Sequence, residues 1–126
     1  MAFEAPGAAL FSFEAAVDLS TKQFHFVKLD GTGKVTTIAA VTDRPLGILQ
    51  NKPVAGQAAT VLFFGISKVV ADENITAGAL VGTSADGQAD GAHAQPVGFA
   101  LIDAGVGNIG TIAFNCLPPM QSALPA

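Results

Sequence analysis

The 126 residues include ten acidic and six basic side chains, which gives a net charge of −4; 13% of the residues are charged and 50% are hydrophobic. This length fits one compact domain with its own core. The acidic balance argues against a nucleic-acid partner, which would need a basic face to displace phosphate counterions. The single cysteine, Cys116, excludes an intrachain disulfide, so the fold must depend on its core or on assembly.

The chain reads as a series of short strands separated by turn residues. Residues 11–17 alternate apolar and polar side chains, which predicts a half-buried strand. No window of a dozen residues shows a helical stripe, although 72–78 could hold one helical turn between an Asp72 cap and Gly78. The pattern predicts an all-β barrel or sandwich. Further strands are expected at 23–29, 35–41, 45–49, 59–64, 66–71, 79–83, 96–102 and 109–115.

The two ends differ from the middle and are predicted to be extended arms, 1–9 and 117–126, on one β domain at 10–116. The first arm is rich in Ala, Pro and Gly, and the second contains three prolines, so neither suits a central strand. A membrane helix is not expected near the second arm, because prolines and glycines interrupt it. Apolar side chains favour docking of the arms on a neighbour. The candidate contact residues are Phe3, Pro6, Leu10, Leu117, Pro118, Pro119, Met120 and Leu124.

The sequence also contains an internal repeat. Residues 45–65 align without a gap to 96–116, at an offset of 51, and the segments upstream correspond with small gaps. We interpret the repeat as two copies of one strand–turn unit, at 22–65 and 79–116, in a pseudo-symmetric small barrel. Two long copies are too few for a solenoid; chance similarity between Gly- and Ala-rich segments is the alternative. The identical pairs are Pro45/Pro96, Gly47/Gly98, Gly56/Gly107, Thr60/Thr111 and Phe63/Phe114.

A glycine-rich stretch, LDGTGKVTT at 29–37, resembles part of a phosphate-binding loop. The full motif needs a glycine where Lys28 stands and a hydroxyl residue where Val35 stands, and no long helix follows. The Asp-Gly pair instead favours a hairpin turn. The second copy holds 84–91 at the same place, so we interpret both stretches as turns.

Catalytic, cofactor-binding and metal-binding residues are all predicted to be absent. The acids Asp30, Asp86 and Asp90 do not follow the order of a calcium loop, and no nucleophile elbow occurs. The pair of carboxylates that are adjacent in sequence, Asp72 and Glu73, falls in a predicted turn. His25, His93 and Cys116 lie too far apart in sequence for a typical zinc motif, and they are the groups that an enzyme would have to use.

One known family does resemble this chain. The stretch ITAGALVGTSADGQA at 75–89, followed by 95–101 and 111–114, resembles the capsid decoration (cement) proteins of tailed bacteriophages, and the first copy has the same texture at 26–31 and 45–49. The resemblance covers about residues 22–115. It implies a β-barrel-like homo-oligomer, often a trimer, which binds the major capsid protein on the outer surface of the virion and stabilises the shell.

The resemblance further implies no catalysis, no cofactor, no nucleic-acid partner and no membrane partner, and it makes the two arms candidates for capsid or subunit contacts. Two alternatives stay open at this point. One is another virion surface module, such as a head fibre base or a receptor- or glycan-binding domain; the other is a small enzyme.

Overall fold

The computed structural model describes residues 9–91 and 96–114, and within these ranges the chain forms strands and turns but no helix. The all-β prediction is therefore confirmed. In the described part, no helix is long and apolar enough to cross a membrane. The strands are β1 (Ala9–Glu14), β2 (Phe26–Leu29), β3 (Val35–Thr37), β4 (Gly47–Leu49), β5 (Ala58–Val70), β6 (Leu80–Thr83), β7 (Ala89–Asp90), β8 (Gly98–Ala100) and β9 (Ile109–Phe114).

Most predicted strands are found with shifted ends, such as β1 at Ala9–Glu14 for the predicted 11–17 and β3 at Val35–Thr37 for the predicted 35–41, and two assignments differ in kind. The runs 59–64 and 66–71 form one strand, β5, because β1 pairs with its first half and β9 with its second half, so the ladder continues past Gly65. The two-residue strand β7 lies inside the stretch 84–91, all of which was predicted to be turn.

The predicted helical turn at 72–78 is wrong. Ile75 forms an isolated antiparallel bridge with Ala104: the Ile75 N–H donates to the Ala104 carbonyl at 2.8 Å, and the Ala104 N–H donates back at 2.9 Å. The Ile75 side chain is also buried in the core. An extended backbone permits both hydrogen bonds and this burial, so the tertiary contacts override the capping signals of Asp72 and Gly78.

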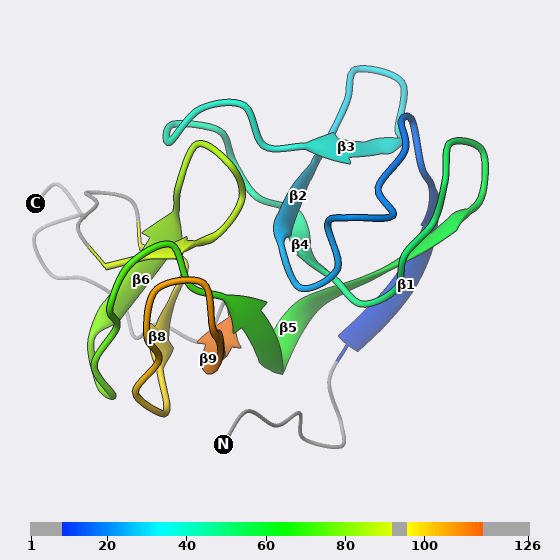
Figure 1. The fold of residues 1–126 in the computed structure, drawn as a ribbon. Coiled ribbons are helices and arrows are strands. Elements are labelled where there is room, and N and C mark those ends of the chain that lie inside the picture. The colour runs from blue at the N-terminus through cyan, green and yellow to red at the C-terminus, as the bar shows by residue number, and fades with distance from the viewer. Residues whose placement is uncertain (1–8, 92–95, 115–126) are drawn as a thin grey trace, which may run out of the picture.

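The sheet order is β3-β2-β4-β5-β9-β8-β6-β7, and β1 pairs with β5 beside this path. Figure 1 shows β1–β4 on one side, β6, β8 and β9 on the other, and β5 running through both. We therefore define a first unit (β1–β4 and residues 58–64 of β5) and a second unit (residues 65–70 of β5 and β6–β9). A parallel bridge closes each unit on itself, Ala15 with Val35 and Ala71 with Ala89.

The two units have the same strand registers, which confirms the pseudo-repeat. The repeat extends beyond the copies seen in the sequence, because β1 in the first unit is equivalent to residues 65–70 of β5 in the second. The equivalent pairs are Phe13↔Ala59 and Val69↔Gly110 for the first strand of each unit, Leu29↔Val35 and Thr83↔Ala89 for the hairpin, and Leu49↔Val61 and Ala100↔Ile112 for the last two strands.

The repeated glycines Gly47 and Gly98 have a steric cause. A Cβ built on Gly47 would overlap the carbonyl oxygen of Leu62, and a Cβ on Gly98 would overlap that of Ala113, the residue equivalent to Leu62. The neighbouring strand approaches the backbone so closely that only glycine fits.

Two hydrophobic clusters hold the fold together. One fills the interior of the first unit. The other fills the second unit and extends into the junction between the units, where Phe26, Ile48 and Leu62 of the first unit join it. The rings of Phe26 and Phe114 lie 5.9 Å apart across this junction. The residues that line the interior of the first unit are Ala15, Leu19, Val27, Val35, Leu49, Ala59 and Val61.

Candidate functional site

Among the residues that the sequence singled out as contacts, the structure describes Leu10. It lies in β1 with its side chain 50% exposed, so it is accessible to a partner. Two further groups considered for chemistry, His93 and Cys116, lie outside the described residues, as does most of both arms. The remaining arm candidates outside the described ranges are Phe3, Pro6, Leu117, Pro118, Pro119, Met120 and Leu124.

The glycine-rich stretch is a tight hairpin loop between β2 and β3. The Asp30 N–H donates to the Lys34 carbonyl at 2.8 Å, and Asp30 Oδ1 accepts the N–H groups of Thr32 and Lys34 at 2.8 and 3.0 Å. Gly33 supplies the positive φ of 85°. The hydrogen bond from the Thr32 backbone holds the pKa of Asp30 below its ordinary value. The Asp30 carboxylate thus stabilises its own loop by hydrogen bonds, and the interpretation of this stretch as a turn is confirmed.

The equivalent loop of the second unit uses a serine in place of the aspartate. The Ser84 N–H donates to the Gln88 carbonyl at 2.8 Å, and Ser84 Oγ accepts the N–H groups of Asp86 and Gln88 at 3.2 and 3.1 Å. Gly87 has φ of 81°, matching Gly33. The structural counterpart of Asp30 is therefore Ser84, and Asp86 occupies a different position of the turn.

His25 is buried where the two units meet. Its Nδ1 lies 3.1 Å from the Gln23 carbonyl, which can only accept, so Nδ1 carries the hydrogen. Its Nε2 then accepts from the Gln88 side-chain amide at 3.4 Å. Burial lowers the pKa of His25 below its ordinary value, and the charge of Lys22 adds to this effect. These contacts give the imidazole a structural role in joining the units.

The acidic residues do not gather into a metal site within the described ranges, where no group of three or more His, Cys, Asp or Glu side chains could hold an ion. The closest association pairs Glu73 with Asp90, and the Asp90 side chain raises the pKa of Glu73. Glu73 also accepts the Gly91 N–H at 3.0 Å. The backbone N–H of its sequence neighbour Asp72 donates to the Ala89 carbonyl at 2.8 Å.

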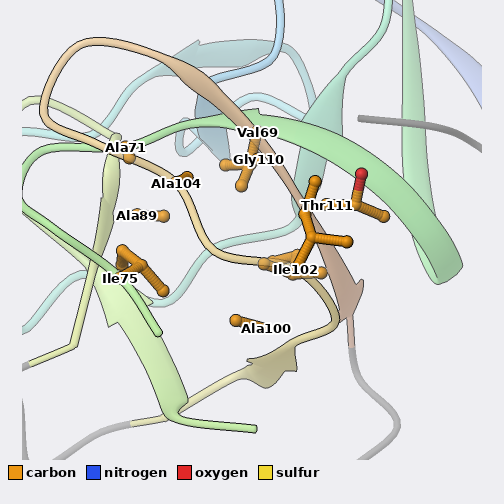
Figure 2. A pocket seen from close by; sticks show the side chains of 10 residues that line it. Val69, Ala71, Ile75, Ala89, Ala100, Ile102, Ala104, Gly110 and Thr111 are labelled. Atoms are coloured by element: carbon orange, nitrogen blue, oxygen red, sulfur yellow. The ribbon is translucent and has the colours of Figure 1, made fainter. Parts of the chain in front are cut away.

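A small cavity lies among the core side chains of the second unit. Figure 2 shows apolar side chains around it, among them the small Ala89 and Ala100 and the larger Ile102. Its volume of about 10 Å³ is near the lower limit for a single water molecule. The equivalent first-unit positions hold larger residues, with Val35 in place of Ala89 and Leu49 in place of Ala100. The cavity is thus a packing defect of the smaller second core, only partly filled by Ile102.

A shallow surface hollow of about 380 Å³ is lined by Lys28, Leu29, Arg44, Pro45 and Leu46. Its lysine is already engaged, because Lys28 Nζ forms an ion pair with Asp43 at 2.8 Å. The Asp43 carboxylate also accepts two backbone N–H groups of its own loop, at 2.8 and 3.0 Å. The hollow therefore offers a wide, partly neutralised surface rather than a pocket that would enclose a small molecule.

The most prominent surface feature is a pair of exposed apolar faces. The first, here called the β1 face, consists of Phe11 and Phe63, where β1 pairs with the first half of β5; Leu10 and Phe64 are also exposed but alternate onto the other side of these strands. Phe11 is 56% exposed although its ring stacks on Phe63 at 4.8 Å, and Phe64 is 52% exposed. Water-exposed aromatic clusters of this kind mark contact surfaces.

The second, here called the β6–β8 face, consists of Leu80, Phe99 and Leu101 at the far side of the second unit. Leu80 is 44% exposed, and it is the cross-strand partner of the half-buried Phe99. The contacts predicted from the sequence include no residue of either face; Leu10 lies in β1 on the side opposite Phe11.

No protein-family model matches this chain, and no curated protein matches its sequence. A solved structure with a similar fold is that of the head fibre gp8.5 N base of bacteriophage phi29. The TM-score is 0.66, the sequence identity is 19%, and the match covers 84% of this chain and 92% of that chain. At this identity the likeness establishes the fold, which the two chains share over nearly their whole described length.

Proposed function

We propose that this chain is a structural protein of a tailed-phage virion, attached to the outer surface of the head. The observation that carries the proposal is the fold shared with the phi29 head fibre base, a phage virion component. The decoration-protein texture of both repeats supports it independently. So does the surface, because low charge and exposed apolar faces suit a protein that buries flat contacts against several neighbours.

In the leading version of this role, the protein clamps neighbouring subunits of the major capsid protein and stabilises the shell. The arms at 1–9 and 117–126 reach capsid or sister subunits, and the protein acts as a homo-oligomer, with a trimer favoured. Extended apolar arms add contact area at the cost of ordering entropy. In this role the protein has no enzymatic activity, no cofactor and no nucleic-acid or membrane partner.

The second candidate is the base of a head fibre. The phi29 neighbour favours it, because that structure is itself a head fibre base. Both candidates place the β domain on the outside of the head. They differ in what the protein does there, since a clamp strengthens the shell and a fibre base anchors a projecting structure.

The test adds the purified full chain to undecorated capsid shells of the cognate phage, with co-sedimentation to measure binding and differential scanning calorimetry to measure shell melting. A clamp binds saturably and raises the melting temperature of the shell. A fibre base binds saturably and leaves that temperature unchanged. Absence of binding under conditions where the chain is folded would overturn both versions.

Truncation addresses the arms separately. Removing residues 1–8, which leaves β1 intact, or residues 117–126 should abolish addition to shells while the circular dichroism of the β domain persists. If both truncated chains decorate shells as well as the full chain does, the arms do not make the capsid contact.

A further inference from the structure

The junction between the two units is a built interface inside one chain. Gln50 Nε2 of the first unit donates to Ser67 Oγ of the second at 2.9 Å. The Lys68 ammonium lies 5.7 Å from the centroid of the Phe24 ring, and the Val70 N–H donates to the Phe24 carbonyl at 3.0 Å. One surface of the first unit, around β2 and β4, thereby covers the first strand of the second unit.

The junction joins one surface of the first unit to a different surface of the second unit. Because the units are repeats, each unit also carries its own copy of the surface that the other unit uses, and these two copies lie outside the junction. The first unit presents its own first strand, β1, where Phe11 and Ser12 are equivalent to Ser67 and Lys68. Phe63 likewise takes the place of Phe114, as the repeat alignment shows. The β1 face is therefore the copy of the surface that the second unit turns toward the first; Phe11 and Ser12 are exposed, whereas Phe63 is half-buried and also packs against the junction cluster.

The second unit presents the outward copy of the other surface. Leu80 is equivalent to Phe26, and Phe99 to Ile48, by their pairing in β6–β8 and β2–β4. Burial shows the consequence, since Phe26 is 1% and Ile48 0% exposed under the second unit, whereas Leu80 is 44% exposed. A third unit placed on the β6–β8 face would cover it as the second unit covers the first.

The residues on the two outward faces match one another in size and polarity. The polar pair Gln50–Ser67 of the junction corresponds to the apolar residues Leu101 and Phe11 on the outward faces. The bulky pair Phe24–Lys68 corresponds to the small pair Gly78 and Ser12. The ring pair Phe26–Phe114 corresponds to Leu80 and Phe63. In the first two pairs both members have changed together, as expected if they meet; in the third, Phe26 is replaced by Leu80 and the phenylalanine is kept.

We propose that the chain self-associates head to tail, with the β6–β8 face of one copy covering the β1 face of the next in the geometry of the internal junction. The occupant of each face is thus a second copy of this chain. Such an interface is heterologous, so an open assembly keeps one free face of each kind until it closes into a ring. The inference rests on the repeat within the chain and not on the virion role, and it is tested on purified protein without capsids.

The test measures mass by native mass spectrometry and by light scattering after size exclusion, over a range of concentrations of the full chain. The wild-type chain forms a closed oligomer. The Phe11→Asp variant disrupts the β1 face, and the Leu80→Asp variant disrupts the β6–β8 face. Each should weaken self-association at least about 100-fold, because a charge would be buried without a partner in a desolvated apolar contact. Val106→Asp, on an exposed turn outside both faces, should leave the mass unchanged.

Mixing the two variants gives the sharpest readout. The Phe11→Asp chain retains its β6–β8 face and the Leu80→Asp chain retains its β1 face, so the mixture forms one-to-one dimers and nothing larger. That result also shows that both variants are folded. A monomeric wild-type chain, variants that keep the wild-type mass, or folded variants that do not form dimers when mixed would each overturn the proposal.

Discussion

Phe24 and Gly78 occupy the same position in the two units, and both have positive φ, 62° and 88°. The N–H of each donates to the equivalent carbonyl at 2.7 Å, that of Leu49 for Phe24 and that of Ala100 for Gly78. The turn therefore demands a left-handed residue. Phenylalanine tolerates this conformation at a cost, and its ring contacts Lys68 in the junction.

This relationship predicts an unusual order of stabilities at residue 24. Phe24→Ala and Phe24→Gly both remove the ring, but glycine relieves the left-handed strain. The glycine variant should therefore be more stable than the alanine variant by about 1 kcal/mol, measured by urea unfolding. Equal stabilities, or an alanine variant that is the more stable, would show that position 24 carries no strain.

Substitution of either repeated close-contact glycine should be severely destabilising. Gly47→Ala and Gly98→Ala each drive a methyl group into a backbone carbonyl that cannot move independently of its strand, so each should cost at least about 3 kcal/mol in free energy of unfolding. Gly31→Ala is the matched control, because an added Cβ there meets nothing within 4 Å. A small loss at Gly47 would mean that β4 and β5 can separate without penalty.

The cavity in the second unit should accept a larger side chain. Ala89→Val places in the second core the residue that the first core has at Val35, and it should raise the free energy of unfolding by up to about 1 kcal/mol. The reciprocal change Val35→Ala should lower it by about 2 kcal/mol, because it opens a cavity in a filled core. Thermal unfolding of both variants tests this asymmetry, and equal losses would contradict it.

His25 should make stability depend on pH in one direction. Its pKa is lowered in the folded state, so the unfolded chain binds the proton more readily, and stability is complete above the unfolded pKa of about 6.5 and declines as the pH falls toward the folded pKa. His25→Gln should remove this part of the decline. The measurement is the difference between wild-type and variant unfolding free energies across pH 5–7, together with an NMR titration of His25. An imidazole that titrates above 6.5 would reverse the predicted sign.

The all-β fold, the turn at residues 30–34 and most of the repeat could be predicted from sequence, because steric demands conserve glycines at equivalent places. Strands are predicted at 11–17 and 66–71, but their equivalence as the first strand of each unit escaped detection for a physical reason. The segments 9–14 and 65–70 share no identical residue, since one is an exposed edge strand and the other is covered at the junction. These two strands therefore keep the same backbone pairing, while their side chains differ because one strand is exposed and the other is covered.

Local signals misled the prediction at 72–78, where Asp72 and Gly78 resemble helix caps but Ile75 is needed in the core. The candidate faces were harder still to foresee. Leu80 sits in a strand whose pattern suits burial, and only its place at the outer end of a two-unit array leaves it exposed. Exposure there is set by the number of units in the chain, which no local sequence pattern encodes.

A cryo-electron microscopy map of the virion that contains this chain would show directly whether the chain is a structural component of a phage head. We expect density on the outer surface of the shell that fits the two-unit fold of residues 9–91 and 96–114. A virion with no such density on its outer shell, or with the chain located in the tail or inside the head, would contradict it.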